Sequence, residues 1–200
     1  MKMTSIEKAI NIFQQHSGTL RTSQALRLGI APRVLYALRD TGQIVEVTRG
    51  VYRLPDAPFI EHSDLVQVTQ RIPKGIICLI SALAFHNMTT QIPHQVYVAL
   101  PLDAEKPRLA YPPVRLFWLS QASYSAGIEE HLLAGVTVRV YSREKTIADC
   151  FKYRNKIGLN VALESLKEGL GQGYKPETLL DFARIDRVEK TMRPYLEALL

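Results

Sequence analysis

The sequence lacks several features that would assign it quickly to a class. No apolar run reaches the roughly 18 residues that a membrane-spanning helix needs. Residues 1–10 have no continuous apolar stretch of the signal-peptide kind, so we expect a cytoplasmic protein without a membrane anchor. Cysteine is scarce: Cys78 and Cys150 each lie inside an apolar pattern. They predict two buried core thiols, with a redox pair or metal ligands as the alternative.

Motifs that would indicate catalysis are missing as well. The sequence contains neither of the glycine-rich phosphate-binding patterns, no G-x-S-x-G and no H-E-x-x-H. It has no E-x-K or D-x-K step of a restriction-type nuclease, and no Gly-Ser step followed by spaced aspartates as in nucleotidyltransferases. Its five histidines are scattered, without metal-ligand spacing to either cysteine. The sequence therefore predicts a protein that is not an enzyme and needs no metal or cofactor.

Positive charge is concentrated in the first quarter of the chain. Residues 1–55 hold eight Lys and Arg against three acidic residues, or +5 out of a net +6 for the whole chain. Such a segment suits a polyanion such as DNA, because each neutralised phosphate releases counterions. Charge alone also allows a merely soluble basic surface.

Residues 5–15 predict a helix that supports the N-terminal core. Thr4 and Glu7 can form a capping box at its start, and apolar side chains then recur at helical spacing. A short edge strand is expected after it, at residues 19–20.

Residues 22–28 predict the first helix of a helix-turn-helix. Thr22 is expected to cap this helix, and Ala25 and Leu26 are expected to face the core. Gly29 should end it, since only glycine enters a left-handed C-terminal turn without strain.

The second helix is expected from Pro32, which suits a first helical turn, to about Thr41. Its exposed arc carries an arginine near the N-terminus and a tyrosine one turn later, and another arginine lies at the border of that arc. This face suits a DNA major groove, because arginine can pair with guanine or phosphate and tyrosine can bond a phosphate or stack.

Residues 44–47 and 51–54 predict the two strands of a hairpin, with Gly50 supplying a positive φ at the turn. Arg49 at the tip is expected to meet phosphate or enter a minor groove, with a solvated turn residue as the alternative. Together with the helices, this is the plan of a winged helix-turn-helix. The predicted DNA-binding residues are Thr22, Arg33, Tyr36, Arg39, Arg49 and Arg53.

A proline-containing linker at 55–58 precedes a second domain. The predicted fold class is α+β: a winged helix-turn-helix in residues 1–55, then an α+β domain in 56–200 with a small mixed sheet and a helical C-terminal end. A proline at position 194 should kink or split the last helix. Strands are expected at 76–80, 95–100, 114–119, 128–133 and 135–141, and helices at 63–71, 81–88, 143–155, 160–170, 176–183 and 188–199.

The helix predicted at 143–155 begins a second basic stretch, with five cations against two acids over residues 143–156. This stretch could touch DNA or a partner protein. In the alternative interpretation, its late cations only complement the helix dipole. The candidate residues of this possible secondary basic surface are Arg143, Lys145, Lys152 and Arg154.

Two stretches resemble one family. Gly29–Leu54, GIAPRVLYALRDTGQIVEVTRGVYRL, resembles the N-terminal winged helix-turn-helix of the AbiEi-like antitoxins, bacterial phage-defence regulators of the type IV toxin–antitoxin class. TRGVYRL is its most specific part. Residues 138–170, VRVYSREKTIADCFKYRNKIGLNVALESLKEGL, resemble a segment of the C-terminal antitoxin domain of the same family. The two stretches occur in the family's order.

The resemblance implies a transcriptional autorepressor of a two-gene abortive-infection operon. It also implies neutralisation of a co-encoded nucleotidyltransferase toxin without a stable complex between the two proteins. Bacterial winged helices usually bind inverted repeats in pairs, so two copies per double-stranded operator are expected. The alternative function is a protein-interaction module with a scaffolding C-terminal domain.

Overall fold

Two units make up the chain, Met1–Glu61 and His62–Leu200. The computed structural model describes residues 3–16, 18–56, 62–109 and 111–200. Part of the predicted linker at 55–58 lies outside these ranges. Within them, no helix combines the length and the apolar character that a membrane crossing requires.

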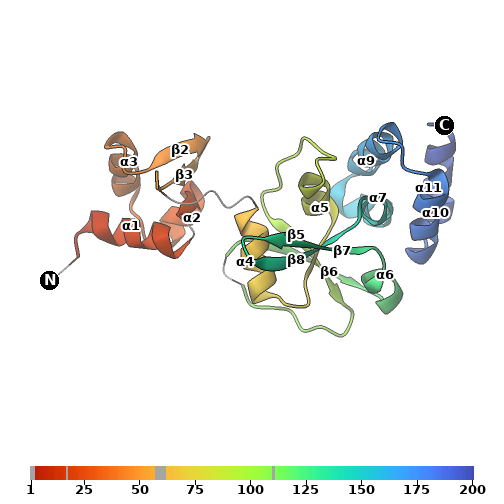
Figure 1. The fold of residues 1–200 in the computed structure, drawn as a ribbon, viewed down its shortest axis with the longest axis horizontal. Helices are drawn as coiled ribbons and strands as arrows, with labels where there is room; N and C mark the ends of the chain where they lie inside the picture. Colours follow the sequence, from red (N-terminus) through yellow and green to blue (C-terminus); the bar gives the residue numbers. More distant parts are fainter. Residues whose placement is uncertain (1–2, 17, 57–61, 110) are drawn as a thin grey trace. The chain divides into compact units, whose positions relative to one another are not determined.

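Three helices and a small antiparallel sheet form the first unit (Figure 1). The helix α1 (Ser5–Gln15) begins with the predicted capping box. Thr4 Oγ1 accepts a hydrogen bond from Glu7 N (3.2 Å), and the Glu7 carboxylate accepts one from Thr4 N (2.7 Å). The remaining elements of this unit are β1 (Thr19–Arg21), α2 (Thr22–Arg27), α3 (Pro32–Asp40), β2 (Val45–Thr48) and β3 (Val51–Arg53).

The strand β3 lies in the middle of this sheet, between β1 and β2. The register of β2 on β3 shifts between Glu46 and Thr48, which places an irregularity next to the hairpin turn. The predicted helix-turn-helix with its hairpin is therefore present, on a core drawn from all three helices and the sheet. The buried residues of that core include Phe13, Leu20, Ala25, Leu35, Leu38, Ile44 and Tyr52.

Two details of α2 differ from the prediction. Thr22 is the first residue of the helix and not its cap, and the backbone N–H before it, of Arg21, donates to Gln24 Oε1 (3.1 Å). Leu26 is exposed, and Gln24 is buried beside Ala25 in its place. Neighbouring residues of a helix point about 100° apart, so a buried Ala25 does not require Leu26 to face the core.

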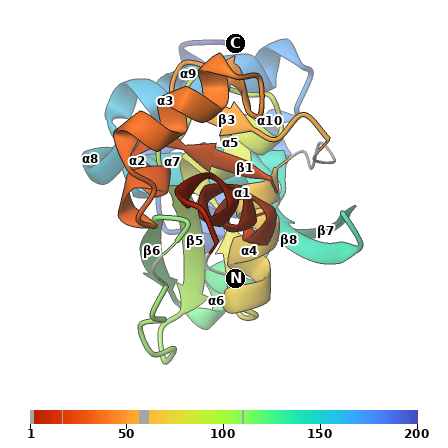
Figure 2. The same ribbon diagram turned by 90° about the vertical axis from the view of Figure 1, so that its left-hand side faces the viewer.

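A five-stranded mixed sheet forms the centre of the second unit. Its strands are β4 (Ile76–Ile77), β5 (Val96–Pro101), β6 (Val114–Leu119), β7 (Ile128–Leu133) and β8 (Val136–Tyr141). In the order β6-β5-β4-β8-β7, the β6/β5 and β4/β8 pairs are parallel and the other two are antiparallel. Figure 2 shows the edge strands β6 and β7 on opposite sides of the sheet.

Helices cover both faces of this sheet. On one face, α4 (Ser63–Arg71) contacts β8 and β5, where Ile77, Val98 and Val140 lie in register and are buried. The other face carries the larger core, which is covered by C-terminal helices. The remaining helices are α5 (Leu79–Phe85), α6 (Gln121–Ser125), α7 (Arg143–Lys152), α8 (Arg154–Ile157), α9 (Leu159–Gly171), α10 (Pro176–Ile185) and α11 (Glu189–Glu197).

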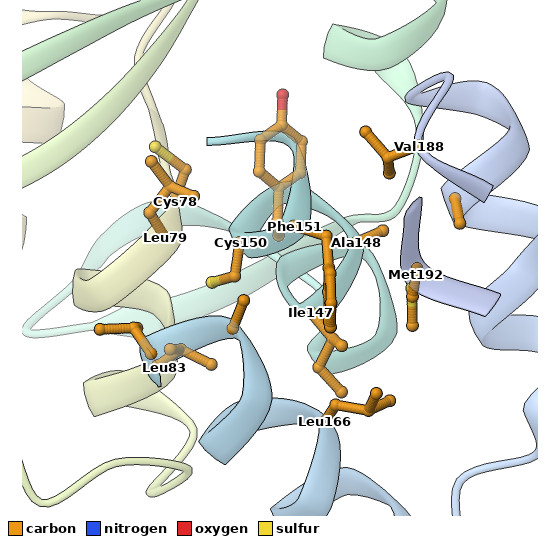
Figure 3. Packing of buried hydrophobic residues seen from close by; sticks show 14 of the residues in the cluster. Cys78, Leu79, Leu83, Ile147, Ala148, Cys150, Phe151, Leu166, Val188 and Met192 are labelled. Atoms are coloured by element: carbon orange, nitrogen blue, oxygen red, sulfur yellow. The ribbon is translucent and has the colours of Figure 1, made fainter. Parts of the chain in front are cut away.

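The helix α7 lies at the centre of this core, in contact with α5, α9 and α10. Its predicted apolar stripe, which includes Ile147 and Cys150, is fully buried. Figure 3 shows these two side chains among Leu83, Leu166 and Met192, which come from three other helices. A helix surrounded in this way has almost no solvent face.

Several boundaries in this unit differ from the prediction. The apolar run predicted as a strand over 76–80 contains only the two-residue β4, and α5 starts at Leu79. A short apolar run fits a strand and a buried helix equally well. Ser81, which begins the predicted helix 81–88, lies inside α5, where its Oγ accepts a hydrogen bond from Tyr97 N (3.0 Å).

Further along the chain, the sequence carries no clear signal for the short α6. The helix predicted at 143–155 ends at Lys152, and α8 follows as a separate short helix. Pro194 lies inside the continuous α11, so the predicted split is absent. Cys78 and Cys150 are free, buried thiols, as predicted. Burial raises the pKa of both thiols, which suits packing residues and not nucleophiles.

Candidate nucleic-acid interface

The helix α3 is amphipathic, with one buried and one exposed side. Leu35 and Leu38 are fully buried against the core of the first unit. Arg33, Tyr36 and Arg39 are all exposed, as the sequence predicts. Because Pro32 starts the helix at its first position, Arg33 stands in the first turn, where it can reach a groove or a phosphate.

Tyr36 and Arg39 form one packed pair on this exposed side. The guanidinium carbon of Arg39 lies 5.0 Å from the centroid of the Tyr36 ring. The same guanidinium pairs with Asp40 at 2.8 Å, and this hydrogen-bonded contact raises the pKa of Arg39. The pair presents a flat ring and an oriented cation together, a combination that can stack or bond phosphate.

The hairpin turn carries the predicted arginine at its tip. Arg49 is exposed, and the following Gly50 has a φ of +72°, as the turn requires. The Glu46 carboxylate accepts a hydrogen bond from Gly50 N (2.8 Å), a contact that the sequence prediction missed. Its only sequence signal is an acid four residues before a turn glycine. This bond holds the backbone that displays Arg49.

Thr22 joins the hairpin turn to the helix-turn-helix. Its hydroxyl donates to Gly50 O (3.2 Å), and its backbone N–H donates to the same oxygen (2.8 Å). Thr22, which was predicted to contact DNA, therefore forms hydrogen bonds within the protein. Arg53 lies away from the tip, half-buried in β3 opposite Thr19 and Val45. DNA contact by Thr22 and by Arg53 stays a prediction.

A small cleft opens beside the start of α3. It has a volume of about 140 Å³ and is lined by α1 residues that include Ser5 and Lys8, and by the 29–34 turn that includes Arg33. Both cations at this cleft, Lys8 and Arg33, are exposed. A phosphate would find two positive side chains here. The predicted DNA-binding residues do not include Lys8, because a lysine on a surface helix is equally typical of a solvated side chain.

A comparison with known protein families finds a match in the first unit. Residues 7–55 match a family described as a transcriptional regulator, AbiEi antitoxin. The first unit is therefore similar to the AbiEi antitoxin family of transcriptional regulators. The match runs from within α1 to just past β3, so it spans the helices and the hairpin described above. No curated protein matches the chain.

The four residues of the possible second basic surface do not form one exposed surface. Lys145 is fully buried, so its assignment as a surface cation was wrong. Lys152 keeps only 25% of its side chain exposed and lies 3.6 Å from Asp186. Arg143 and Arg154 are partly exposed, and Arg154 donates to Phe151 O (2.8 Å). Helical spacing could not reveal that α10 covers this side of α7.

Lys145 is the centre of a buried ionic network. Its ammonium donates to Asp149 (2.6 Å) and to Asp186 (3.1 Å), which lie in α7 and just after α10. Ser123 of α6 also donates to Asp186 (2.5 Å). The pKa of Asp149 is raised to about 7, because burial and the charge of Asp186 raise it more than Lys145 lowers it. Lys145 and Ser123 have no exposed surface, and the network joins α6, α7 and the residue that follows α10.

The structure also gathers histidines that the sequence separates. The rings of His62, His86 and His131 surround Phe85, at centroid distances of 5.0, 5.2 and 4.7 Å. His86 Nε2 lies 2.8 Å from Tyr141 O, and burial lowers the pKa of this imidazole. No set of three His, Cys, Asp or Glu side chains in the described ranges is placed to hold a metal ion.

Proposed function

We propose that this protein is an operator-binding autorepressor and the antitoxin of a type IV toxin–antitoxin operon. The observation that carries this proposal is the exposed row of Arg33, Tyr36 and Arg39 on α3, in the same unit as an exposed Arg49 at the hairpin turn. A helix of this kind enters a major groove, and the arginine of the turn meets phosphate or a minor groove. The match of residues 7–55 to a regulator family supports the same conclusion.

Two further parts of the proposal come from the family resemblance. The protein acts in the cytoplasm on an inverted-repeat operator, with two copies per site, because paired half-sites are typical of winged helices. It counteracts a co-encoded nucleotidyltransferase toxin without forming a stable complex with it. The fully buried Lys145 has no part in contacting either partner.

The test is binding of duplex DNA from upstream of the gene, measured by fluorescence anisotropy over a series of salt concentrations. Arg33→Ala and Arg49→Ala should each weaken binding by about 1–3 kcal/mol. A variant that loses a phosphate contact should also show a shallower salt dependence, by about one unit in the log–log slope. Arg108→Ala is the matched control, since Arg108 is an exposed arginine of the second unit.

Absence of any increase in anisotropy at low salt would contradict operator binding and favour a protein-interaction module. Unchanged affinity in both arginine variants would move the DNA-binding site elsewhere. The antitoxin half of the proposal has its own test. Co-expression should rescue growth from the nucleotidyltransferase encoded next to this gene, and lack of rescue would contradict that half alone.

A further inference from the structure

We propose that the second unit binds a nucleoside phosphate beside the edge strand β6. The site combines a cluster of cations on aromatic rings with an adjoining surface hollow. Every residue involved belongs to the second unit, so this inference does not depend on DNA binding by the first unit.

Three aromatic rings gather where the end of α7 meets β5 and β6. Tyr97 and Phe117 are stacked, with centroids 5.9 Å apart, and Tyr153 meets Phe117 edge-on at 4.9 Å. The guanidinium carbon of Arg115 lies 5.7 Å from the Tyr97 ring and 5.6 Å from Phe117. The ammonium of Lys156 lies 5.7 Å from both Phe117 and Tyr153. Two cations from distant parts of the sequence therefore share one aromatic platform.

This cluster of cations has no matching anion of its own. Arg115 donates a hydrogen bond to the carbonyl oxygen of Lys156 (3.2 Å), which holds the two residues side by side. Within the described ranges, neither Arg115 nor Lys156 forms an ion pair with a carboxylate. Lys152, 5.9 Å from the Tyr153 ring, pairs with Asp186 at 3.6 Å and is not counted in this cluster. Since gathered like charges repel, an anion bound here would be stabilised.

A hollow of about 340 Å³ adjoins this cluster through Tyr97, which lines it. Its apolar lining comes from Ile80, Ile92 and Pro93, and the amide side chains of Gln91 and Gln95 also line it. Ile92 is 73% exposed, so its side chain is open to a ligand. The volume is at the lower end of the range of small-ligand pockets, about 300–1,000 Å³.

The cation cluster and the hollow fit the phosphate and the base of one ligand. Arg115 and Lys156 can bind phosphate oxygens, and the guanidinium can do so through two parallel hydrogen bonds. The apolar side chains of the hollow can contact the faces of a base, while the two glutamine amides offer donors and acceptors to its edge. Tyr97, which is 8% exposed, borders both parts and therefore places the cations next to the hollow. A free nucleoside phosphate is therefore the ligand class that the site predicts.

The test uses the full-length protein at low salt, titrated with ATP, GTP, CTP, UTP and, separately, pyrophosphate. Isothermal titration should show that at least one nucleotide binds more tightly than pyrophosphate, and that it raises the melting temperature. Arg115→Ala and Lys156→Ala should each weaken nucleotide binding by on the order of tenfold. Gln95→Ala should reduce the preference among bases and leave pyrophosphate affinity unchanged.

The controls separate this site from general charge and from the first unit. Lys167→Ala removes an exposed lysine of α9 and should leave nucleotide affinity unchanged, as should Arg33→Ala. Lys156 is exposed, so its variant tests the cluster even if the partly buried Arg115 is needed for folding. Nucleotides that bind no better than pyrophosphate would overturn the role of the hollow. Affinity unchanged by both cluster variants, or competition by duplex DNA for the same residues, would overturn the proposal.

Discussion

The hydroxyl and the backbone N–H of Thr22 both donate hydrogen bonds to the carbonyl oxygen of Gly50, at 3.2 and 2.8 Å, across a separation of 28 residues. The start of the helix-turn-helix and the turn of the hairpin are therefore one connected structure. Arg49 precedes Gly50 directly, so its position relative to the helices depends on this contact. Two predictions test the contact from its two ends.

Thr22→Val keeps the shape of the side chain and removes the hydroxyl donor. We expect the free energy of unfolding of the first unit to fall by about 1 kcal/mol, the usual value of one such bond. Operator affinity should fall a few-fold, because the hairpin is held less firmly. Thr41→Val is the matched control: Thr41 donates its hydroxyl to Ala37 O (2.8 Å) at the end of α3, away from the hairpin. If both variants lose affinity equally, the Thr22 contact has no special role in placing Arg49.

Gly50→Ala tests the other end of the same contact. Gly50 has a φ of +72°, and an added Cβ would lie 3.3 Å from Thr22 Oγ1. Gly42 has a nearly identical φ of +71° but open space around its Cβ position. Gly42→Ala should therefore cost about 1–2 kcal/mol of backbone strain alone, and Gly50→Ala should cost more. Urea unfolding followed by far-UV circular dichroism measures the difference, and equal costs would contradict a tight Thr22–Gly50 contact.

Lys145→Met tests the buried ionic network of the second unit. Removing the ammonium leaves Asp149 and Asp186 facing one another without their shared partner. We expect a loss of about 3–5 kcal/mol in the free energy of unfolding, as for other broken buried ion pairs. Fluorescence of Trp118, the sole tryptophan, reports on this unit. The control Lys167→Met removes an exposed lysine and should change stability by less than about 0.5 kcal/mol. A similarly small loss in Lys145→Met would show that the network does not stabilise the fold.

The raised pKa of Asp149 predicts a pH effect of defined sign. Its pKa is about 7 in the folded protein, mainly through burial, against about 4 for an exposed aspartate. Between these values the folded state binds more protons than the unfolded state. The stability from this group is therefore fully present below pH ~4 and is lost as the pH rises through about 7.

Asp149→Asn provides the measurement of that effect. Asparagine has a similar shape and stays uncharged, so its variant should lack this contribution to the pH dependence. Wild-type stability relative to Asp149→Asn should increase as the pH falls from 8 to 5, read from Trp118 fluorescence in urea. A difference that stays constant over this range, or that changes in the opposite direction, would contradict the raised pKa.

Local signals in the sequence predicted most elements of the first unit. The capping box at Thr4 and Glu7, the turn at Gly50 and the exposed side of α3 all follow from spacing and residue type. Each depends on residues only a few positions apart, so a short stretch already contains the physical cause. The exposed Arg33, Tyr36, Arg39 and Arg49 lie where the sequence predicts them.

Contacts between distant segments were not predictable in the same way. Lys145 has the spacing of a surface cation, yet Asp186, 41 residues later, brings it into the core. Serine is a typical residue at a helix cap, yet Ser81 lies inside α5, where its hydroxyl accepts a hydrogen bond from the backbone N–H of Tyr97 in β5. In both cases the energy of a buried polar contact depends on a partner that local periodicity cannot specify.

By itself, the sequence determined the winged helix-turn-helix and its exposed basic side chains, because hydrophobic periodicity, turn glycines and capping are local effects. Only the tertiary structure decided three other features: the Thr22–Gly50 contact, the buried Lys145 network, and the cluster of Arg115 and Lys156 on shared aromatic rings. Each joins residues from separate segments. Such residues meet because buried polar groups need hydrogen-bond partners. The spacing of residues along the chain does not show which distant residue will be that partner.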